Sequence, residues 1–336
     1  MKAKGIRYKD AGVDIASGEK AVDRIKKMVR STFDSNVLTD LGKFGGFFAL
    51  KSGEYREPVL VSSVDGVGTK LKVAFLADKH DTIGEDLVNH CINDIFVGGA
   101  RPLFFLDYIA TSKIRPAVIE EILRGMVRGC RNAGCALIGG EMAEMPGFYA
   151  KGEYDVAGMI VGIVEKSRII DGSSIRKGDV LIGLPSNGLH TNGYSLARKV
   201  FFDVAKWSVK RRIPEFGCTL GEELLRVHRC YLPVLDPLLS KHRIKGLSHI
   251  TGGGIVGNTR RILPRGRSLS IQWKAWTIPP VFRMIQKLGR VPDSDMRKTF
   301  NLGIGLVLIT DTDSVDPILA VLKAKRESPS VIGRVV

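Results

Sequence analysis

Apolar residues along the first half of the chain follow the periods of strands and helices in turn. Short β-branched or aromatic runs predict strands, and the expected ones cover residues 58–61, 103–109, 135–138 and 154–164. From Gly84 to Gly98 the apolar residues recur at helical intervals, which predicts an amphipathic helix. A second helix is expected to begin at Pro116 and to end before Gly134, because proline opens helices and glycine commonly follows their last turn. These elements predict a mixed α and β domain.

The second half contains the same mixture in a different order. The expected strands cover residues 180–184, 302–310 and 330–336, and the expected helices cover residues 194–204, 222–239, 255–263, 280–288 and 316–325. Between the halves, residues 165–178 are polar and rich in turn-forming residues, which is typical of a domain boundary. Because domains of about 100–200 residues are usual, the 336 residues predict two domains. We place them at residues 1–166 and 167–336, each with an α+β or α/β fold.

Composition excludes several classes of protein. No run of about 18 apolar residues occurs, and the charged start is not followed by an apolar stretch, so neither a membrane span nor a secretory signal is expected. The five cysteines are odd in number and form no CxxC pair. Free thiols of this kind are typical of a reducing cytosol and argue against a disulfide framework or a zinc site. We therefore expect a cytoplasmic globular protein.

The chain is strongly basic, with 51 lysines and arginines against 35 acidic residues and a formal net charge of +16. Such a balance can indicate a nucleic-acid partner. The basic residues are densest in residues 198–212 and 260–274, yet neither stretch has a zinc-finger spacing, an RNA-recognition signature or interleaved aromatic residues. A solvated basic surface is therefore the favoured interpretation, and nucleic acid is not expected as a partner. A small polyanionic substrate would be attracted by the same field.

A glycine-rich loop after the first expected strand is the first candidate for chemistry. Residues 65–70 read DGVGTK. Glycines let backbone N–H groups turn toward phosphate oxygens, Lys70 adds positive charge, and Asp65 is a candidate ligand of Mg²⁺. The spacing is not that of a Walker A loop. A tight turn with a capping aspartate is the alternative interpretation.

Two acidic positions are further candidates. Asp94 lies near the end of the helix expected from Gly84. A buried carboxylate there opposes the negative end of the helix dipole unless a cation is bound, so Asp94 is a candidate metal ligand. A solvent-facing aspartate is the alternative. Glu141 lies in a loop framed by glycine and proline after an expected strand, which suits general-base chemistry or cation binding as well as an ordinary acidic loop.

Two polar or glycine-rich loops complete the candidates. In the loop 186–195, His190 can exchange hydrogen bonds with a phosphate or an amide, whereas Asn192 could be a helix N-cap without further function. Residues 252–257 formally match the dinucleotide-binding fingerprint. No acidic residue follows at the distance that holds the ribose, so we reject that interpretation. A helix that starts at such a turn can still bind an anion.

Ten motifs occur in a single order along the chain. They are YKDAGVD (8–14), DGVGTK (65–70), HDTIG (80–84), IND (92–94), PLFFLDY (102–108), GGEMAEMPG (139–147), YDVAG (154–158), NGYSL (192–196), TGGG (251–254) and TFNLGIG (299–305). Together they closely resemble the phosphoribosylformylglycinamidine cyclo-ligases, also called aminoimidazole ribonucleotide synthetases. The resemblance covers nearly the whole chain. YKDAGVD, PLFFLDY and AEMPG are specific to this family, whereas the acidic and glycine-rich loops recur across its ATP-binding superfamily.

The resemblance implies a two-domain ATP-binding synthetase fold. The sheet of an α+β N-terminal domain would join that of a second subunit in a homodimer, and the C-terminal domain would be mixed α/β. ATP would bind near the N-terminal domains with Mg²⁺, and K⁺ is a further candidate cation. The implied reaction converts formylglycinamidine ribonucleotide and ATP into aminoimidazole ribonucleotide, ADP and phosphate in purine biosynthesis. Phosphorylation of the amide oxygen to an iminophosphate would let the neighbouring nitrogen close the ring.

The resemblance also assigns roles to residues of this chain. The implied nucleotide-binding residues are Lys26, Asp65, Gly66, Gly68, Thr69, Lys70 and Asp94. The candidates for substrate contact or proton handling are Glu141, His190 and Asn192. Asp65 and Asp94 match the magnesium carboxylates of the superfamily, and Lys70 with its glycines would contact the phosphates. His249 stands where some relatives have a metal-binding aspartate.

Several positions depart from the pattern of the family. The departures are Arg101 for a common acid, Val227-His228 for proline and threonine, Gly257 for glutamate, Arg260 for proline and Lys298 for arginine. They bear mainly on substrate contacts of the C-terminal domain and leave the phosphate loops unaffected. Two alternatives remain. One is a kinase of the same superfamily acting on a thiamine phosphate or on selenide, against which the family-specific motifs speak, and the other is a nucleic-acid binder.

Overall fold

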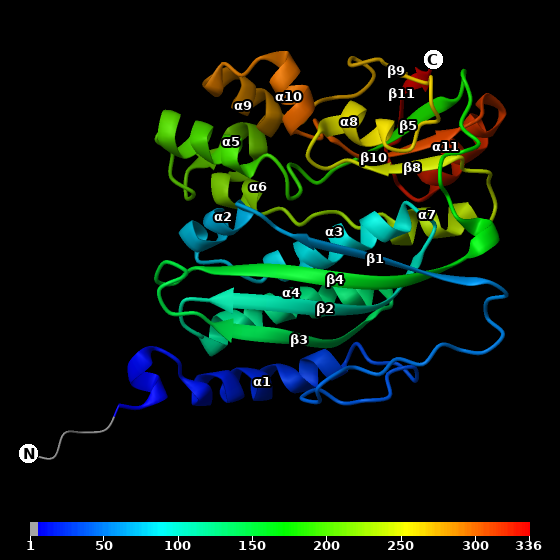
Figure 1. Ribbon diagram of the computed structural model, residues 1–336. Helices are drawn as coiled ribbons and strands as arrows, with labels where there is room; N and C mark the ends of the chain where they lie inside the picture. Colours follow the sequence, from blue (N-terminus) through cyan, green and yellow to red (C-terminus); the bar gives the residue numbers. More distant parts are fainter. Residues whose placement is uncertain (1–5) are drawn as a thin grey trace, which may run out of the picture.

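Two large β-sheets, one in each half of the chain, organise the computed structural model, which describes residues 6–336, and a two-stranded sheet is added in the C-terminal half. The N-terminal half forms the lower part of the molecule in Figure 1, and the C-terminal half forms the upper part. Residues 166–179 connect the two halves along one side. Within the described residues, no helix combines the length and apolar character that a membrane crossing requires.

The N-terminal sheet has the strand order β1-β4-β2-β3. The elements of this half are α1 (Ile15–Arg30), β1 (Pro58–Gly66), α2 (Lys70–Ala77), α3 (Ile83–Phe96), β2 (Arg101–Thr111), α4 (Pro116–Ala133), β3 (Ala136–Glu144) and β4 (Tyr154–Glu165). Strands β2 and β3 are parallel, and the other neighbours are antiparallel. The four predicted strands and both predicted helices are confirmed, and Gly134 follows α4 in the left-handed conformation, with φ 68°. Helices α1 and α2 have no counterpart in the sequence prediction.

Helices α3 and α4 cover one face of this sheet and cross each other in backbone contact. A Cβ atom on Gly84 would overlap the carbonyl oxygen of Ile122, and one on Gly125 would overlap that of Asp81. Glycine is therefore required on both sides of the crossing. Helix α3 also packs against β1 and β4, and it carries Asp94, one of the acidic candidates of the sequence analysis.

The opposite face of the N-terminal sheet is largely uncovered. Along β1, Leu60 and Val64 point away from the helices, and the side chain of Val64 is 66% exposed. Met159 of β4 is exposed on the same face, because it pairs with Val64. On its other side Met159 pairs with Leu106 of β2, and Tyr108, two residues further along β2, is exposed on this face as well. In Figure 1 this face of the strands lies in front of α3 and α4. An apolar sheet face of this kind is suited to bind another surface.

The C-terminal sheet has the strand order β8-β10-β5-β11-β9, and every neighbouring pair is antiparallel. Its half contains the strands β5 (Val180–Pro185), β6 (Arg212–Ile213), β7 (Cys218–Thr219), β8 (Gly246–His249), β9 (Leu269–Ile271), β10 (Ile304–Thr310) and β11 (Ser330–Val335). The helices are α5 (Tyr194–Arg198), which continues as a π-helix at Lys199–Val204, α6 (Leu220–Leu224), α7 (Leu232–Leu239), α8 (Gly254–Arg260), α9 (Pro280–Gly289), α10 (Asp293–Thr299) and α11 (Val315–Ala324).

The single helix expected at residues 222–239 is wrong, because residues 225–231 separate α6 from α7. The cause is helix α3, whose polar side chains bind the backbone of this segment in place of helical hydrogen bonds. Asn89 donates to the carbonyl oxygen of His228, and Asn93 donates to that of Arg229, both at 2.8 Å. The Asn93 Oδ1 atom also accepts from the Tyr231 N–H at 2.9 Å. These contacts attach the C-terminal half to α3.

Candidate functional site

A cavity of about 940 Å³ lies between the two halves of the molecule. Its N-terminal wall comes from β1, α3 and β4, and its C-terminal wall comes from the loop before α5, from β8 and from α8. The polar and charged side chains that line it include Ser63, Asp65, His90, Asp94, Asp155, Thr191, Asn192, His249, Asn258 and Arg261. A space of this size between two domains is typical of a ligand site.

The N-terminal wall brings Asp65 and Asp94 together. Ser63 and Asp65 alternate with the exposed residues of β1 and therefore point toward α3. His90 and Asp94 are one turn apart on α3, so they face the same way. Asp65 Oδ2 lies 2.7 Å and Asp94 Oδ2 3.7 Å from His90 Nε2, and Ser63 Oγ donates to Asp94 Oδ2 at 3.2 Å. The two carboxylates thus converge on one ring nitrogen.

Three residues of the C-terminal half continue the contacts of this wall. His249, the last residue of β8, places Nδ1 2.8 Å from Asp94 Oδ1 and Nε2 2.9 Å from His228 Nε2. His228 Nδ1 lies 3.3 Å from the Thr191 hydroxyl, which lies 2.8 Å from His90 Nδ1. Asp65 and Asp94 are therefore joined by a continuous chain of contacts through three imidazoles and one hydroxyl.

The number of hydrogens in this chain has a chemical consequence. Five contacts separate Asp65 from Asp94, and each needs one hydrogen to be a hydrogen bond. Three neutral imidazoles and the Thr191 hydroxyl supply only four. When both carboxylates are ionised, one additional proton, or a cation in its place, is needed to satisfy every contact.

Burial and the two carboxylates set the charges at the site. Burial disfavours ionised carboxylates, but the hydrogen bonds from His90 and His249 outweigh it and lower the pKa of Asp65 and the pKa of Asp94. Burial also disfavours a charged His90, yet the hydrogen bond to Asp65 and the charge of Asp94 raise the pKa of His90. Burial lowers the pKa of His249, which as a neutral ring still donates Nδ1–H to Asp94. In the absence of a bound cation, the additional proton therefore belongs on His90.

The expected phosphate contact of Lys70 does not fit the structure. Lys70 opens α2, and its side chain is fully buried, at 0% exposure. Its ammonium lies 2.8 Å from Asp86 and donates to the carbonyl oxygens of His190, at 3.2 Å, and Arg226, at 2.7 Å. All three hydrogens are thus used inside the protein. We correct the expectation: Lys70 holds the two halves together and does not face the cavity.

The glycines of the loop 65–70 do reach the cavity. Gly66 and Gly68 line it, and Gly68 has a left-handed φ of 56°. The backbone N–H of Gly66 donates to Asp65 Oδ1 at 2.7 Å. Thr69 contacts the C-terminal half, with its hydroxyl 3.0 Å from that of Ser195. The loop therefore combines open backbone at the cavity with a contact between the halves.

Of the two candidates in the loop before α5, Asn192 reaches the cavity and His190 does not. Asn192 lines the space beside Thr191, and it is not the N-cap of α5, which is Gly193. His190 is fully buried and stacked on His228, with ring centroids 4.1 Å apart. Its Nε2 accepts from the Asn187 N–H at 3.0 Å, and burial holds the pKa of His190 well below its usual range. His190 therefore stabilises the conformation of the loop 186–195 from inside the protein and does not contact the cavity.

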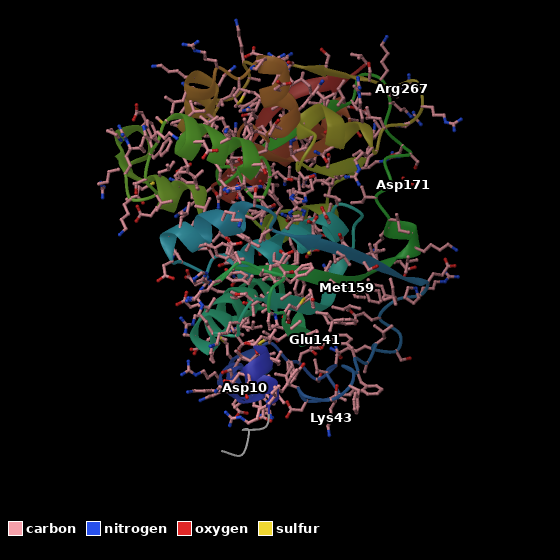
Figure 2. The ribbon with its side chains drawn as sticks, turned by 60° about the vertical axis from the view of Figure 1, so that its left-hand side comes forward. Asp10, Lys43, Glu141, Met159, Asp171 and Arg267 are labelled. Atoms are coloured by element: carbon pink, nitrogen blue, oxygen red, sulfur yellow. The ribbon has the colours of Figure 1, made fainter. Side chains whose placement is uncertain are left out.

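Glu141 and Lys26 lie away from this cavity in the same chain. The expectation that Glu141 lies in a loop is wrong, because β3 extends through it to Glu144. Glu141 lines a separate cavity of about 520 Å³ beside α1, together with Asp107. Figure 2 shows Glu141 between Met159 and Lys43, on the side of the N-terminal half that is remote from the C-terminal half. Lys26 is on α1 near Asp40, which lines this second cavity. Burial raises the pKa of Asp107 to about 7.

The glycine-rich turn at 252–257 is explained by packing. Helix α8 begins at Gly254, where a Cβ atom would overlap the carbonyl oxygen of Arg297 in α10. Gly253 has a left-handed φ of 104°, and its N–H donates to the carbonyl oxygen of Lys298 at 2.9 Å. Lys298, which replaces the arginine usual in the family, therefore contacts this turn through its backbone carbonyl oxygen. The turn needs glycine because it lies so close to α10.

Sequence reasoning missed the polar residues that join the halves. Asp86, Asn89 and Asn93 recur at helical intervals on one face of a largely apolar helix, which is a signal for a buried polar partner. His90 precedes Asp94 by one helical turn and could have been found in the same way. His228 had no such signal, because it reaches the site from a segment with no regular structure.

These features define a two-domain protein with a ligand cavity between an N-terminal and a C-terminal α and β domain. The chain matches the corresponding pair of family domains. Residues 54–164 match AIR synthase related protein, N-terminal domain, and residues 176–336 match AIR synthase related protein, C-terminal domain. The class of protein is therefore that of the AIR synthase fold.

Full-length relatives narrow the class to one family. The chain is 51% identical over 331 residues to phosphoribosylformylglycinamidine cyclo-ligase of Alkaliphilus oremlandii, covering 98% of this chain and 97% of the relative. It is 53% identical over 328 residues to the enzyme of the same name from Trichlorobacter lovleyi, covering 98% and 94%. The chain belongs to the phosphoribosylformylglycinamidine cyclo-ligase family.

Solved structures with the same fold are more distant in sequence. Thiamine-monophosphate kinase from Stenotrophomonas maltophilia superimposes with a TM-score of 0.70 at 17% identity, covering 94% of this chain and 93% of the kinase. The hydrogenase maturation protein HypE in complex with ATP has a TM-score of 0.62 at 16% identity, covering 94% and 86%. At this identity the likeness shows the fold alone, and the prediction of two domains of mixed α and β structure is confirmed.

Proposed function

We propose that this chain catalyses the ATP-dependent closure of formylglycinamidine ribonucleotide to aminoimidazole ribonucleotide, with release of ADP and phosphate. The support is that relatives named for this reaction share about half of all residues with the chain over nearly its whole length. The reaction is a step of purine biosynthesis. Membership in the family carries the proposal, and the cavity between the domains supplies a place for it.

The charges of the cavity support a requirement for Mg²⁺. Asp65, Asp94 and Asp155 line it, and among the described lining residues Arg261 is the one lysine or arginine. A bare triphosphate would be repelled by this wall in spite of the basic chain as a whole. The carboxylates of Asp65 and Asp94 fit Mg²⁺, which prefers oxygen ligands. Bound there, the ion would neutralise phosphate charge during phosphoryl transfer. K⁺ is a further cation to compare with Na⁺ in the assay.

The reaction proceeds in two proposed steps. The amide oxygen of the substrate attacks the γ-phosphorus of ATP, ADP leaves and the amide nitrogen gives up its proton, so that an iminophosphate is formed. The neighbouring amidine nitrogen then attacks the activated carbon, phosphate departs with the former amide oxygen, and the nitrogen loses a proton. Asn192 is suited to orient the amide, and the backbone at Gly66 and Gly68 leaves room for phosphate groups.

The convergence of Asp65 and Asp94 within the cavity is the observation that ties the proposed chemistry to this site. The test is to incubate the protein with formylglycinamidine ribonucleotide, ATP and Mg²⁺ and to measure ADP and aminoimidazole ribonucleotide. We expect one ADP for each imidazole formed. Absence of ADP release in this assay would contradict the proposal. Thiamine monophosphate serves as the alternative acceptor, and its phosphorylation in place of ring closure would indicate a kinase.

We also propose that the protein is a homodimer formed through the uncovered face of the N-terminal sheet. Leu60, Val64, Tyr108 and Met159 give this face an exposed apolar surface, which is costly to leave in water. Val64→Arg should therefore halve the mass measured by light scattering during gel filtration. Leu76→Arg, which places the same charge on an exposed apolar residue of α2, is the control and should leave the mass unchanged. A monomeric parent protein would contradict this part of the proposal.

A cytoplasmic location is part of the same proposal. All five cysteines are free in the described part of the chain, and Cys91, Cys130 and Cys135 are buried. Free thiols persist in a reducing compartment. Activity of the protein purified and assayed with a reductant, and its loss on oxidation of the two half-buried cysteines, would agree with this location.

A further inference from the structure

Four metal-binding groups meet in the cavity, three on its N-terminal wall and one, His249, on its C-terminal wall. They are the imidazoles of His90 and His249 and the carboxylates of Asp65 and Asp94. The His90 Nε2 atom is 2.7 Å from Asp65 Oδ2, and the His249 Nδ1 atom is 2.8 Å from Asp94 Oδ1. One donor atom each from His90, Asp94 and His249 lie within 4.8 Å of one another. Ligands of one ion at about 2.1 Å are spaced about 3–4 Å apart, so small side-chain shifts suffice to enclose an ion.

The outer ring nitrogens of both histidines are held in the way that metal-binding histidines require. His90 Nδ1 lies 2.8 Å from the Thr191 hydroxyl, and His249 Nε2 lies 2.9 Å from His228 Nε2. Such outer contacts fix the orientation of each ring and leave the inner nitrogen available for the ion. All four groups line the cavity, so an ion has an entry path and room for water or phosphate oxygens as further ligands.

The geometry points to a site for a first-row transition-metal dication, with His90 and His249 as ligands beside Asp65 and Asp94. Mg²⁺ prefers oxygen ligands, whereas imidazole nitrogen suits first-row transition metals, and the affinity of such sites rises from Mn²⁺ to Co²⁺. A set of two imidazoles and two carboxylates therefore binds these ions more tightly than Mg²⁺. This inference specifies which class of ion binds at the metal site of the proposed function. It rests on the proposed function only in taking this cavity to be the active site.

The first test measures the affinities of Mg²⁺, Mn²⁺ and Co²⁺ for the full chain by calorimetry without nucleotide. We expect Mn²⁺ to bind at least about tenfold more tightly than Mg²⁺, and Co²⁺ more tightly still. Co²⁺ should also give a visible absorption spectrum shaped by nitrogen ligands. Electron spin-echo measurements on the Mn²⁺ form should detect coordinated imidazole nitrogen in the unmodified protein, which needs no variant to fold.

The second test removes the imidazoles one at a time. His90→Ala and His249→Ala should each weaken Co²⁺ binding by about tenfold or more, since even outer contacts of a metal site commonly contribute that much. His242→Ala is the matched control, because His242 lies in a different cavity and should leave Co²⁺ binding unchanged. Circular dichroism of each variant checks that the protein is folded.

Mg²⁺ binding as tight as Mn²⁺, or a Mn²⁺ form without nitrogen coupling, would overturn the assignment. Equal Co²⁺ affinities in the His90, His249 and His242 variants would do the same. Because metal binding is measured without substrate, these outcomes are independent of ring closure. An active enzyme with an oxygen-only ion would retain the proposed function and remove this inference, whereas a nitrogen-bound ion in a protein without ring closure would do the reverse.

Discussion

Helix α3 carries two aspartates, Asp86 and Asp94, and only Asp86 has a lysine or arginine beside it. Asp86 is fully buried, lies 2.8 Å from the Lys70 ammonium and accepts the His228 N–H at 2.7 Å. Asp94, two turns later, has only histidines and a serine as partners and borders the cavity. The first carboxylate has a permanent internal cation, and the second is left for a cation from outside. An aspartate on this helix is therefore structural where its charge is balanced within the fold, and it is available to a ligand where its charge is not.

The largest expected effect comes from removing the internal cation. Lys70→Met leaves the Asp86 carboxylate buried without a partner charge, which should lower the free energy of unfolding by about 3–5 kcal/mol. The measurement is denaturant unfolding followed by circular dichroism. Lys70→Met combined with Asp86→Leu should recover part of the loss, since no unpaired charge remains. Equal losses in the single and double variants would show that the pair is not what makes Lys70 important.

The second effect concerns the open carboxylates. Asp94→Asn and Asp65→Asn keep the shape of each side chain and remove its charge, so we expect a loss of about 10²–10³ in kcat from weaker stabilisation of phosphoryl transfer. Stability should change by less than about 1 kcal/mol, because both side chains face the cavity. The two readouts are steady-state ring closure and denaturant unfolding. Unchanged rates at saturating Mg²⁺ would remove the proposed metal role.

The third effect is a pH dependence that separates the two aspartates further. Burial raises the pKa of Asp86 to about 6 even with Lys70 present, and the unfolded value is about 3.9. A folded pKa above the unfolded one means that the folded state binds more protons, so stability falls as pH rises. Without Lys70 the pKa rises further. The destabilisation by Lys70→Met should therefore be about 1–2 kcal/mol smaller at pH 5.5 than at pH 8, as measured by unfolding at both values. A constant difference would contradict the assignment.

The smallest effect is expected at the surface. Arg101 and Asp236 form an exposed ion pair between the halves, with the Arg101 Nε atom 3.0 Å from Asp236 Oδ1. Exposed pairs of this kind contribute little, so Arg101→Ala should lower the free energy of unfolding by less than about 1 kcal/mol and leave the rate of ring closure unchanged. The same denaturant titration measures it, with 1 M salt added to screen the pair in the parent protein. A loss as large as that of Lys70→Met would show that exposure does not distinguish the two pairs.

The contrast between Asp94 and Lys70 also shows how far sequence reasoning extended. The sequence predicts a metal ligand at Asp94 because a carboxylate at the end of a helix opposes the dipole, and the structure places Asp94 at the cavity. The glycine-rich neighbours of Lys70 predict a phosphate contact, but Lys70 opens α2 and its side chain is buried inside the protein. The spacing of residues within a helix predicts which side chains share a face of that helix. It does not give the direction of a side chain at the junction between a loop and a helix, where packing against another domain decides.

The sequence by itself determined the four strands of the N-terminal sheet, strands β5, β10 and β11 of the C-terminal sheet, helices α3 and α4, and the family, because these depend on hydrophobic periods and ordered motifs within short segments. It did not predict the short strands β8 and β9. Only the tertiary structure decided that residues 225–231 would leave the helical conformation, because backbone groups there bind side chains of α3 more than 130 positions away. It also decided that His90 and His249 would meet Asp65 and Asp94. Side chains that come from separate segments share a site only after the domains have packed, and no period along the chain records that contact.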